Sequence, residues 1–217
     1  MKWKFVTALM LISFLLLSVG IYNAFSLPQS PQPSLRDNYR ILFFHVPSAI
    51  VSFIAFTTTL ISSFQYIRTG NFKWDSLASS SAKFGFFMIT AALISGSIWA
   101  KVAWGSYWNW DPRETTVLIL WFAYAAYFAL RESVENKEDK AKISSIFSIF
   151  AYVTIPLSYL STKFYFSLHP STQEVSIGVN VGMTLGMNMT AFILLFLTYL
   201  FLDSFLNDVE RKMEVEQ

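Results

Sequence analysis

Residues 46–67 read VPSAIVSFIAFTTTLISSFQYI, an uninterrupted run without a charged side chain. A helix that crosses the hydrocarbon core of a bilayer needs about 20 such residues. Five further runs are predominantly apolar, at 5–22, 82–103, 115–130, 143–161 and 176–202. The sequence therefore predicts an all-α polytopic membrane protein with six transmembrane helices.

The composition supports a membrane protein and excludes several other classes. Of the 217 residues, 54% are hydrophobic and only 14% are charged, whereas soluble domains carry roughly a quarter charged residues. Six crossings use most of the chain, so we expect a single membrane domain over 1–217. The absence of cysteine excludes disulfides, thiolate metal sites and CxxC redox chemistry.

Two further partner classes are disfavoured by charge and motif. A net charge of +2 is too small to indicate nucleic-acid binding. No GxxxxGK[ST] phosphate loop occurs, so any ATP used by a system containing this protein is expected to be hydrolysed by a partner.

The first apolar run is open to two interpretations. Lys2 and Lys4 precede it and Ala24-Phe25-Ser26 loosely resembles a small-residue cleavage site, as in a secretory signal peptide. The run is long for the apolar region of a signal peptide, which favours an uncleaved helix.

The distribution of lysine and arginine predicts the orientation, because these residues are retained on the cytoplasmic side. With the N-terminus inside, eleven of the sixteen basic residues fall on inner segments and five on outer ones. We therefore expect both termini in the cytoplasm.

This topology puts the two histidines of the chain on the outer side. His45 lies at the outer start of the second predicted helix, and His169 lies in the loop before the sixth. Four of the seven tryptophans also gather at the outer end of the third helix and in the loop after it, namely Trp99, Trp104, Trp108 and Trp110.

Two imidazoles beside clustered indoles suggest haem. Imidazole binds iron, copper and zinc, but a simple zinc site usually needs three or four protein ligands. The porphyrin supplies four nitrogens to haem iron and leaves two axial positions, which His45 and His169 could fill. Aromatic side chains such as Trp108 could flank the flat macrocycle. The alternative is that these tryptophans anchor the helix ends at the membrane interface and that the histidines are structural.

Residues 111–114, Asp-Pro-Arg-Glu, have the pattern of a helix start. Asp111 fits the N-cap, Pro112 the first helical position, and Glu114 the third position of a capping box. Asp111 thus has a structural explanation without any chemistry. The outward N-terminus of this helix, together with Arg113, could attract the propionates of haem, although Arg113 would equally suit an interfacial anchor. Three glycines at four-residue spacing in the last run predict close helix packing, namely Gly178, Gly182 and Gly186.

The segment 104–115, WGSYWNWDPRET, resembles the tryptophan-rich WGxxWxWD signature of the haem-handling membrane proteins of cytochrome c biogenesis. With HVPSA at 45–49, SLHP at 167–170 and six predicted helices, the chain resembles the exporter C branch of the system I maturation pathway over nearly its whole length. The Asp-Pro-Arg-Glu-Thr continuation is also similar to the system II haem lyases, which are larger and carry more histidines. A third alternative is a channel or scaffold subunit without haem.

The resemblance implies a haem transport component of the bacterial plasma membrane rather than an enzyme. Haem b, the transported substrate, would bind at the periplasmic face with His45 and His169 as axial ligands of the iron. The implied partners are the periplasmic haem chaperone (maturation protein E), the ATP-binding cassette proteins A and B, the small membrane protein D and the lipid bilayer. The tryptophan loop would lie along the macrocycle through Trp104, Gly105, Trp108, Trp110 and Asp111.

Overall fold

A computed structural model describes residues 2–30, 35–169 and 178–215, and within these ranges the chain is all-α without any β-strand. The helices in chain order are α1 (Lys2–Ser26), the 3-10 helix η1 (Asn38–Ile41), α2 (Leu42–Thr69), α3 (Phe72–Trp104), α4 (Pro112–Ser133), α5 (Lys137–Ala151), α6 (Thr154–Phe164) and α7 (Val179–Val215).

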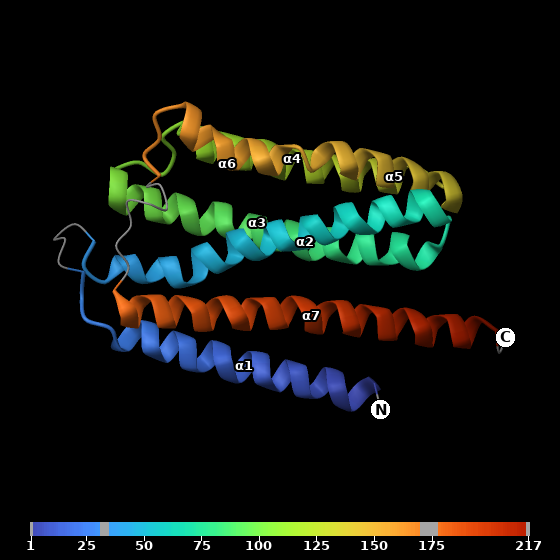
Figure 1. Ribbon diagram of the computed structural model, residues 1–217, viewed down its shortest axis with the longest axis horizontal. Coiled ribbons are helices and arrows are strands. Elements are labelled where there is room, and N and C mark those ends of the chain that lie inside the picture. Colours follow the sequence, from blue (N-terminus) through green and yellow to red (C-terminus); the bar gives the residue numbers. More distant parts are fainter. Residues whose placement is uncertain (1, 31–34, 170–177, 216–217) are drawn as a thin grey trace.

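The described helices are those of a multi-pass membrane protein. Five helical segments are long and apolar enough to cross a bilayer: Trp3–Ser26, Asn38–Thr69, Phe72–Trp104, Lys137–Phe164 and Val179–Asn207. The predicted run 115–130 lies in α4, which is not among these five and has Glu114 in its first turn and Arg131 in its last. α4 nevertheless runs alongside the other helices (Figure 1). Its crossing of the membrane, which would be the sixth, stays a prediction.

The predicted runs fall inside helices with two exceptions. The run 143–161 covers both α5 and α6, which are separated by turn residues at Tyr152 and Val153. Pro156 follows this break and has no N–H to donate to the carbonyl of Tyr152, and the N–H of Ile155 bonds to that carbonyl instead at 3.0 Å. The run 176–202 begins at residues 176 and 177, which lie outside the described residues, and its remainder lies in α7.

The helices lie side by side in three layers (Figure 1). α2 and α3 form the middle layer, α4 lies with α5 and α6 on one side, and α1 packs against α7 on the other. The start of α1 and the end of α7 lie at one end of the bundle. The links from α3 to α4 and from η1 to α2 lie at the opposite end, which is hereafter called the loop end.

Glycines set how closely some helices approach. A methyl group at Gly85 of α3 would lie 2.8 Å from Cε1 of Phe56 on α2, so only glycine leaves room for this ring. Phe56 also stacks on Tyr124 of α4, with ring centroids 3.6 Å apart. In contrast, a methyl group at Gly178 or Gly186 would have no neighbour within 4 Å among the described residues. The packing predicted from these two glycines therefore has no partner helix within the described chain.

A buried ion pair ties α3 to α4 at the end that carries the chain termini. Arg131 donates two hydrogen bonds to the carboxylate of Asp75, at 2.8 and 2.7 Å. Both side chains are largely buried, with exposed fractions of 14% and 10%. Such a paired geometry satisfies both charges, whereas either group alone would be costly to bury.

Candidate functional site

The predicted site residues all lie at the loop end of the bundle, on segments far apart in the sequence. His45 is in the first turn of α2, Trp104 ends α3, Asp111 precedes α4, and His169 follows α6. The antiparallel course of the helices brings these four points to one end (Figure 1).

The imidazole of His45 lies in the contact between α2 and α3. Its Nδ1 is 3.0 Å from the backbone oxygen of Ala92 and 3.2 Å from the hydroxyl of Ser95. A carbonyl oxygen can only accept, so Nδ1 carries the proton and donates it to Ala92. Within the described residues Nε2 has no hydrogen-bond partner. The neutral ring therefore presents the lone pair of Nε2, which is the form that binds metals.

The tryptophan loop begins where α3 ends. Gly105 adopts φ +86°, a left-handed conformation that favours glycine, and its N–H donates to the carbonyl of Lys101 at 3.2 Å. The ammonium of Lys101 donates in return to the carbonyl of Gly105 at 2.9 Å. These bonds end the helix directly after Trp104 and turn the chain into the loop.

Polar contacts hold the rest of the loop in place. Ser97 on α3 donates to the carbonyl of Tyr107 at 2.9 Å, and Ser106 donates to that of Trp108 at 3.0 Å. The capping-box prediction for Glu114 was wrong in its target: its carboxylate accepts from the N–H of Asn109 at 2.9 Å, two residues before the N-cap. Glu114 therefore fixes the loop that approaches α4.

Trp108 and Trp110 pack against each other edge to face, with ring centroids 5.9 Å apart. Trp110 is 75% exposed and has φ +55°, which is uncommon for a residue other than glycine. The loop thus presents a large aromatic surface outward instead of burying it.

Asp111 connects α4 to the segment that carries His169. It caps α4, as predicted, by accepting from the N–H of Arg113 at 2.9 Å. The same carboxylate accepts from the hydroxyl of Ser167 at 2.8 Å, the N–H of Leu168 at 2.6 Å and Nδ1 of His169 at 3.1 Å. Only 1% of its side chain is exposed. One carboxylate therefore serves as a helix cap and as the anchor of His169.

The protonation states of this pair follow from their surroundings. Burial raises the pKa of Asp111, but the hydrogen bonds from Ser167, Leu168 and Arg113 outweigh it and hold the pKa below its ordinary value. Burial lowers the pKa of His169, and the Asp111 carboxylate opposes this only in part. At neutral pH Asp111 is therefore a carboxylate that accepts the Nδ1 proton of a neutral His169, whose Nε2 keeps its lone pair.

Both histidines, Trp104 and Arg113 lie in one electrostatic neighbourhood. The ring of Trp104 meets that of His169 edge to face at 5.0 Å. The two imidazoles and the guanidinium of Arg113 lie close enough together for a charge on any one of them to act on the others. The structure thus brings these four residues and Asp111 together, whereas the rings of Trp108 and Trp110 pair with each other.

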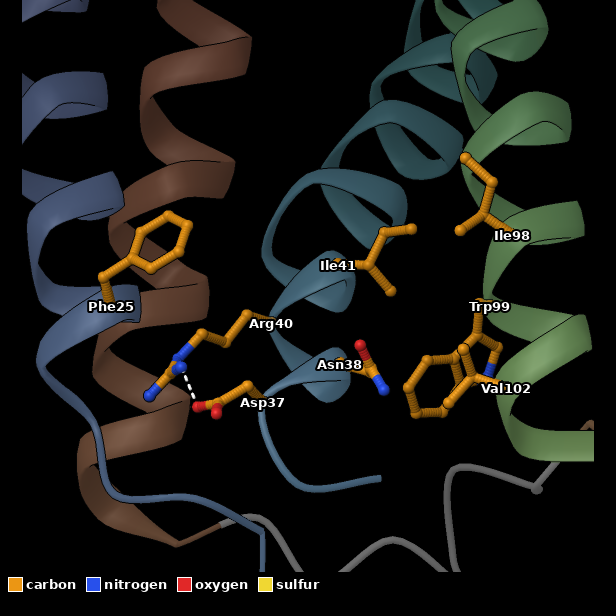
Figure 2. Close-up of a pocket in the computed structure, with 8 residues that line it drawn as sticks. All are labelled: Phe25, Asp37, Asn38, Arg40, Ile41, Ile98, Trp99 and Val102. Carbon is orange, nitrogen blue, oxygen red and sulfur yellow. Dashed lines mark hydrogen bonds and ion pairs between the residues drawn. The ribbon is translucent and has the colours of Figure 1, made fainter. Parts of the chain in front are cut away.

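A separate groove of about 330 Å³ opens between α1, η1 and α3 (Figure 2). Phe25, Ile41 and Trp99 line it, so Trp99 lies apart from the other tryptophans of the cluster. At its edge Arg40 pairs with Asp37 and also donates to backbone carbonyls at the end of α1, at 2.9 and 2.7 Å. Arg40 therefore fastens α1 to η1.

The sequence did not reveal the residues that hold the two imidazoles. Ala92, Ser95 and Gly96 surround His45 from α3, and no local motif in α3 distinguishes them from other small residues. The sequence indicates a role for Ser167 only weakly. It stands two residues before a histidine, and at this spacing a serine hydroxyl can accept a hydrogen bond from the backbone N–H. It does so from His169 at 3.1 Å.

Comparisons with known proteins agree on one family. The family described as "Heme exporter protein C" (CcmC) matches residues 1–217. A ccmC-like mitochondrial protein of cytochrome c biosynthesis from Marchantia polymorpha is 31% identical over 76% of this chain and 69% of its own. Heme exporter protein C of Paracoccus denitrificans is 32% identical over 70% of this chain and 61% of its own. The Escherichia coli K12 protein of the same name is 27% identical over 82% and 73%.

Proposed function

Because the chain belongs to the haem exporter protein C family of cytochrome c biogenesis, we propose that it holds haem b as a transported substrate at the loop end of the bundle. The family is a transport component rather than a catalyst, so the role of the chain is to bind, orient and hand on the molecule. The iron would be bound by Nε2 of His45 and Nε2 of His169.

One observation carries this assignment: both imidazoles have Nδ1 occupied and Nε2 without a partner among the described residues. A backbone carbonyl accepts from His45, and a buried carboxylate accepts from His169. Metal-binding histidines usually donate their second N–H to a carbonyl or a carboxylate, which fixes the tautomer and the orientation of the ring. Two such rings in one neighbourhood fit the two axial positions of haem iron.

The surrounding residues suit the rest of a haem molecule. Trp104, Trp108 and Trp110 offer apolar faces to the macrocycle, and Gly105 provides the turn that places the last two of them in the loop. Arg113 and the N-terminus of α4 supply positive charge for the propionates. Asp111 acts indirectly, through His169.

The orientation in the membrane is part of the proposal. The excess of basic residues on the predicted inner segments supports cytoplasmic termini, with six crossings in one membrane domain over 1–217. Since the loop end lies opposite the chain ends (Figure 1), the site would face the periplasm from a bacterial plasma membrane.

The partners follow from the family. We expect haem to pass to a periplasmic haem chaperone, the maturation protein E, with the help of the ATP-binding cassette proteins A and B and the small membrane protein D. An exposed edge of the loop, where Trp110 lies, would let a chaperone side chain reach the porphyrin while the histidines still hold the iron.

The test is the visible absorption spectrum and the haem-to-protein ratio of the purified chain beside a His45→Ala, His169→Ala double variant. We expect co-purified haem with a six-coordinate low-spin spectrum that is lost or becomes high-spin in the double variant. Each single histidine variant should lose more haem than Asp111→Asn does, because the amide keeps one acceptor oxygen.

Three outcomes would count against the proposal. Equal haem and spectra in the wild type and the double variant would assign the iron to other ligands. A wild type that neither carries nor takes up haem would favour a scaffold or channel subunit. A haem-loaded protein that needs no chaperone would favour a system II lyase.

A further inference from the structure

Gly96 of α3 lies directly beneath the imidazole of His45. A methyl group at position 96 would be 2.8 Å from Cε1, 3.3 Å from Nδ1 and 3.7 Å from Nε2 of this ring. Contacts below 3 Å between carbon atoms are strongly repulsive, so even alanine would require the ring or a helix to move. The absence of a side chain at this position is what admits the ring.

His45 has little freedom to escape such a contact. Its Nδ1 is fixed by the carbonyl of Ala92, one helical turn from Gly96 on the same helix. A ring displaced by a methyl group would lose this bond, and with it the orientation of Nε2. Because α2 and α3 pack against each other, a shift of either helix to make room would also disturb their other contacts.

The same arrangement occurs a second time between α2 and α3. Phe56 meets Gly85 as His45 meets Gly96, with a methyl group at position 85 falling 2.8 Å from Cε1 and 2.9 Å from Cδ1 of the phenylalanine. Both members of the second pair are eleven residues, about three helical turns, from those of the first. The contact thus seats two aromatic rings over two glycines, and only the ring at the loop end carries nitrogen.

We propose that Gly96 is a positioning residue that aims Nε2 of His45 at the haem iron, an inference that rests on the function proposed above. Gly96 contacts no iron itself and acts entirely through the orientation of His45. Gly85 provides the matched site, because its substitution creates the same kind of clash in the same pair of helices without involving an imidazole.

The experiment compares Gly96→Ala with Gly85→Ala in the purified, haem-loaded protein. In Gly96→Ala we expect the six-coordinate low-spin spectrum to change to five-coordinate high-spin, with haem affinity reduced about ten-fold or more, the usual effect of disturbing a group that orients a metal ligand. Gly85→Ala should retain the low-spin spectrum even where its thermal stability falls. Gly186→Ala, where a methyl group would meet no atom of the described residues within 4 Å, should match the wild type in both the spectrum and the thermal stability.

A double-mutant cycle with His45→Ala tests whether Gly96 acts through the ring. Once the imidazole is gone the clash is relieved, so Gly96→Ala should add no further loss of haem in the His45→Ala background. This double variant also guards against a Gly96→Ala protein that fails to fold.

The outcomes separate this inference from the proposed function. A low-spin wild type with an equally low-spin Gly96→Ala variant would overturn the role of Gly96 alone. Equal spectral changes in Gly85→Ala and Gly96→Ala would reduce that role to general packing. A wild type without haem would overturn the proposed function itself.

Discussion

The two histidines at the loop end are held by different means. His45 projects from a helix into a helix contact, and its Nδ1 bonds to a backbone carbonyl. His169 lies in a loop after α6, and its Nδ1 bonds to the side chain of Asp111. Its own segment is fastened through Ser167 and Leu168 to that same carboxylate.

If both imidazoles bind the iron as proposed, this difference would make one of them a fixed ligand and the other an exchangeable one. A carbonyl within a helix cannot rotate away, and neighbouring residues lock it in place. The loop that carries His169 is held by hydrogen bonds from Ser167, Leu168 and His169 to one carboxylate, and it is free to move once these bonds break. We therefore expect His45 to retain the iron while His169 is the first ligand to leave during transfer.

The largest effect on stability should come from a change remote from both histidines. Arg131→Met leaves the buried carboxylate of Asp75 without its partner, which should cost about 3–5 kcal/mol of unfolding free energy. Unfolding in detergent measures this cost. In the folded fraction we expect an unchanged haem spectrum, because the ion pair lies at the end with the chain termini. If the haem spectrum of Arg131→Met changes as well, the positions of both histidines would depend on the stability of the whole bundle.

Asp111→Ala should have the next largest effect and should act on one histidine alone. This change removes the N-cap of α4 and the acceptor for the donors of the His169 segment. It should lower the free energy of unfolding by about 2–3 kcal/mol. Because His45 keeps its hydrogen bond to the carbonyl of Ala92, it should stay in place as the remaining ligand. We therefore expect a five-coordinate high-spin spectrum with part of the haem retained. Asp111→Asn is the control, since asparagine caps helices well and keeps one acceptor oxygen. Complete loss of haem in Asp111→Ala would argue against the expectation that His45 binds the iron independently of Asp111.

Ser167→Ala should weaken the loop without removing its anchor. The hydroxyl donates to Asp111 and accepts from the N–H of His169 at 3.1 Å. Removing this hydroxyl should destabilise the attached His169 segment by about 1 kcal/mol. That corresponds to about five-fold faster displacement of His169 from the iron by added imidazole. Stopped-flow absorbance measures this rate. Thr162→Ala is a suitable control, because its hydroxyl donates to the carbonyl of Tyr159 within α6 and not to Asp111. An unchanged rate in Ser167→Ala would show that the loop is held by Asp111 alone.

The sequence was sufficient to predict where most of the helices lie, although the run 143–161 covers two of them, and it predicted the grouping of residues at one end. Apolar runs set the helices, because a membrane crossing demands length and the absence of charge, and an antiparallel course then returns every second link to the same end. His45, Trp104, Asp111 and His169 could therefore be grouped before any coordinates were considered, and the cap at Asp111 could be predicted from its neighbours alone.

What the sequence could not supply were contacts between residues distant along the chain. Gly96 is one of eight glycines, and its importance depends on the ring that faces it from α2. The link from Asp111 to His169 spans 58 positions and requires a folded loop. The glycines at the start of α7 and just before it show the reverse case, since their spacing predicted close packing but a methyl group at Gly178 or Gly186 would meet nothing within 4 Å in the described chain.

The smallest effect should come from Ser95→Ala, which tests directly whether His45 is held more firmly than His169. Ser95 lies 3.2 Å from Nδ1 of His45 but donates its own proton to the carbonyl of Ala91 at 2.6 Å. The carbonyl of Ala92 still accepts from the imidazole when this hydroxyl is removed. The substitution should therefore weaken the hold on His45 by about 1 kcal/mol or less. We expect a low-spin spectrum and an imidazole exchange rate close to that of the wild type. If Ser95→Ala instead accelerates exchange as much as Ser167→Ala, the two histidines are held equally firmly and the order of release proposed for them is wrong.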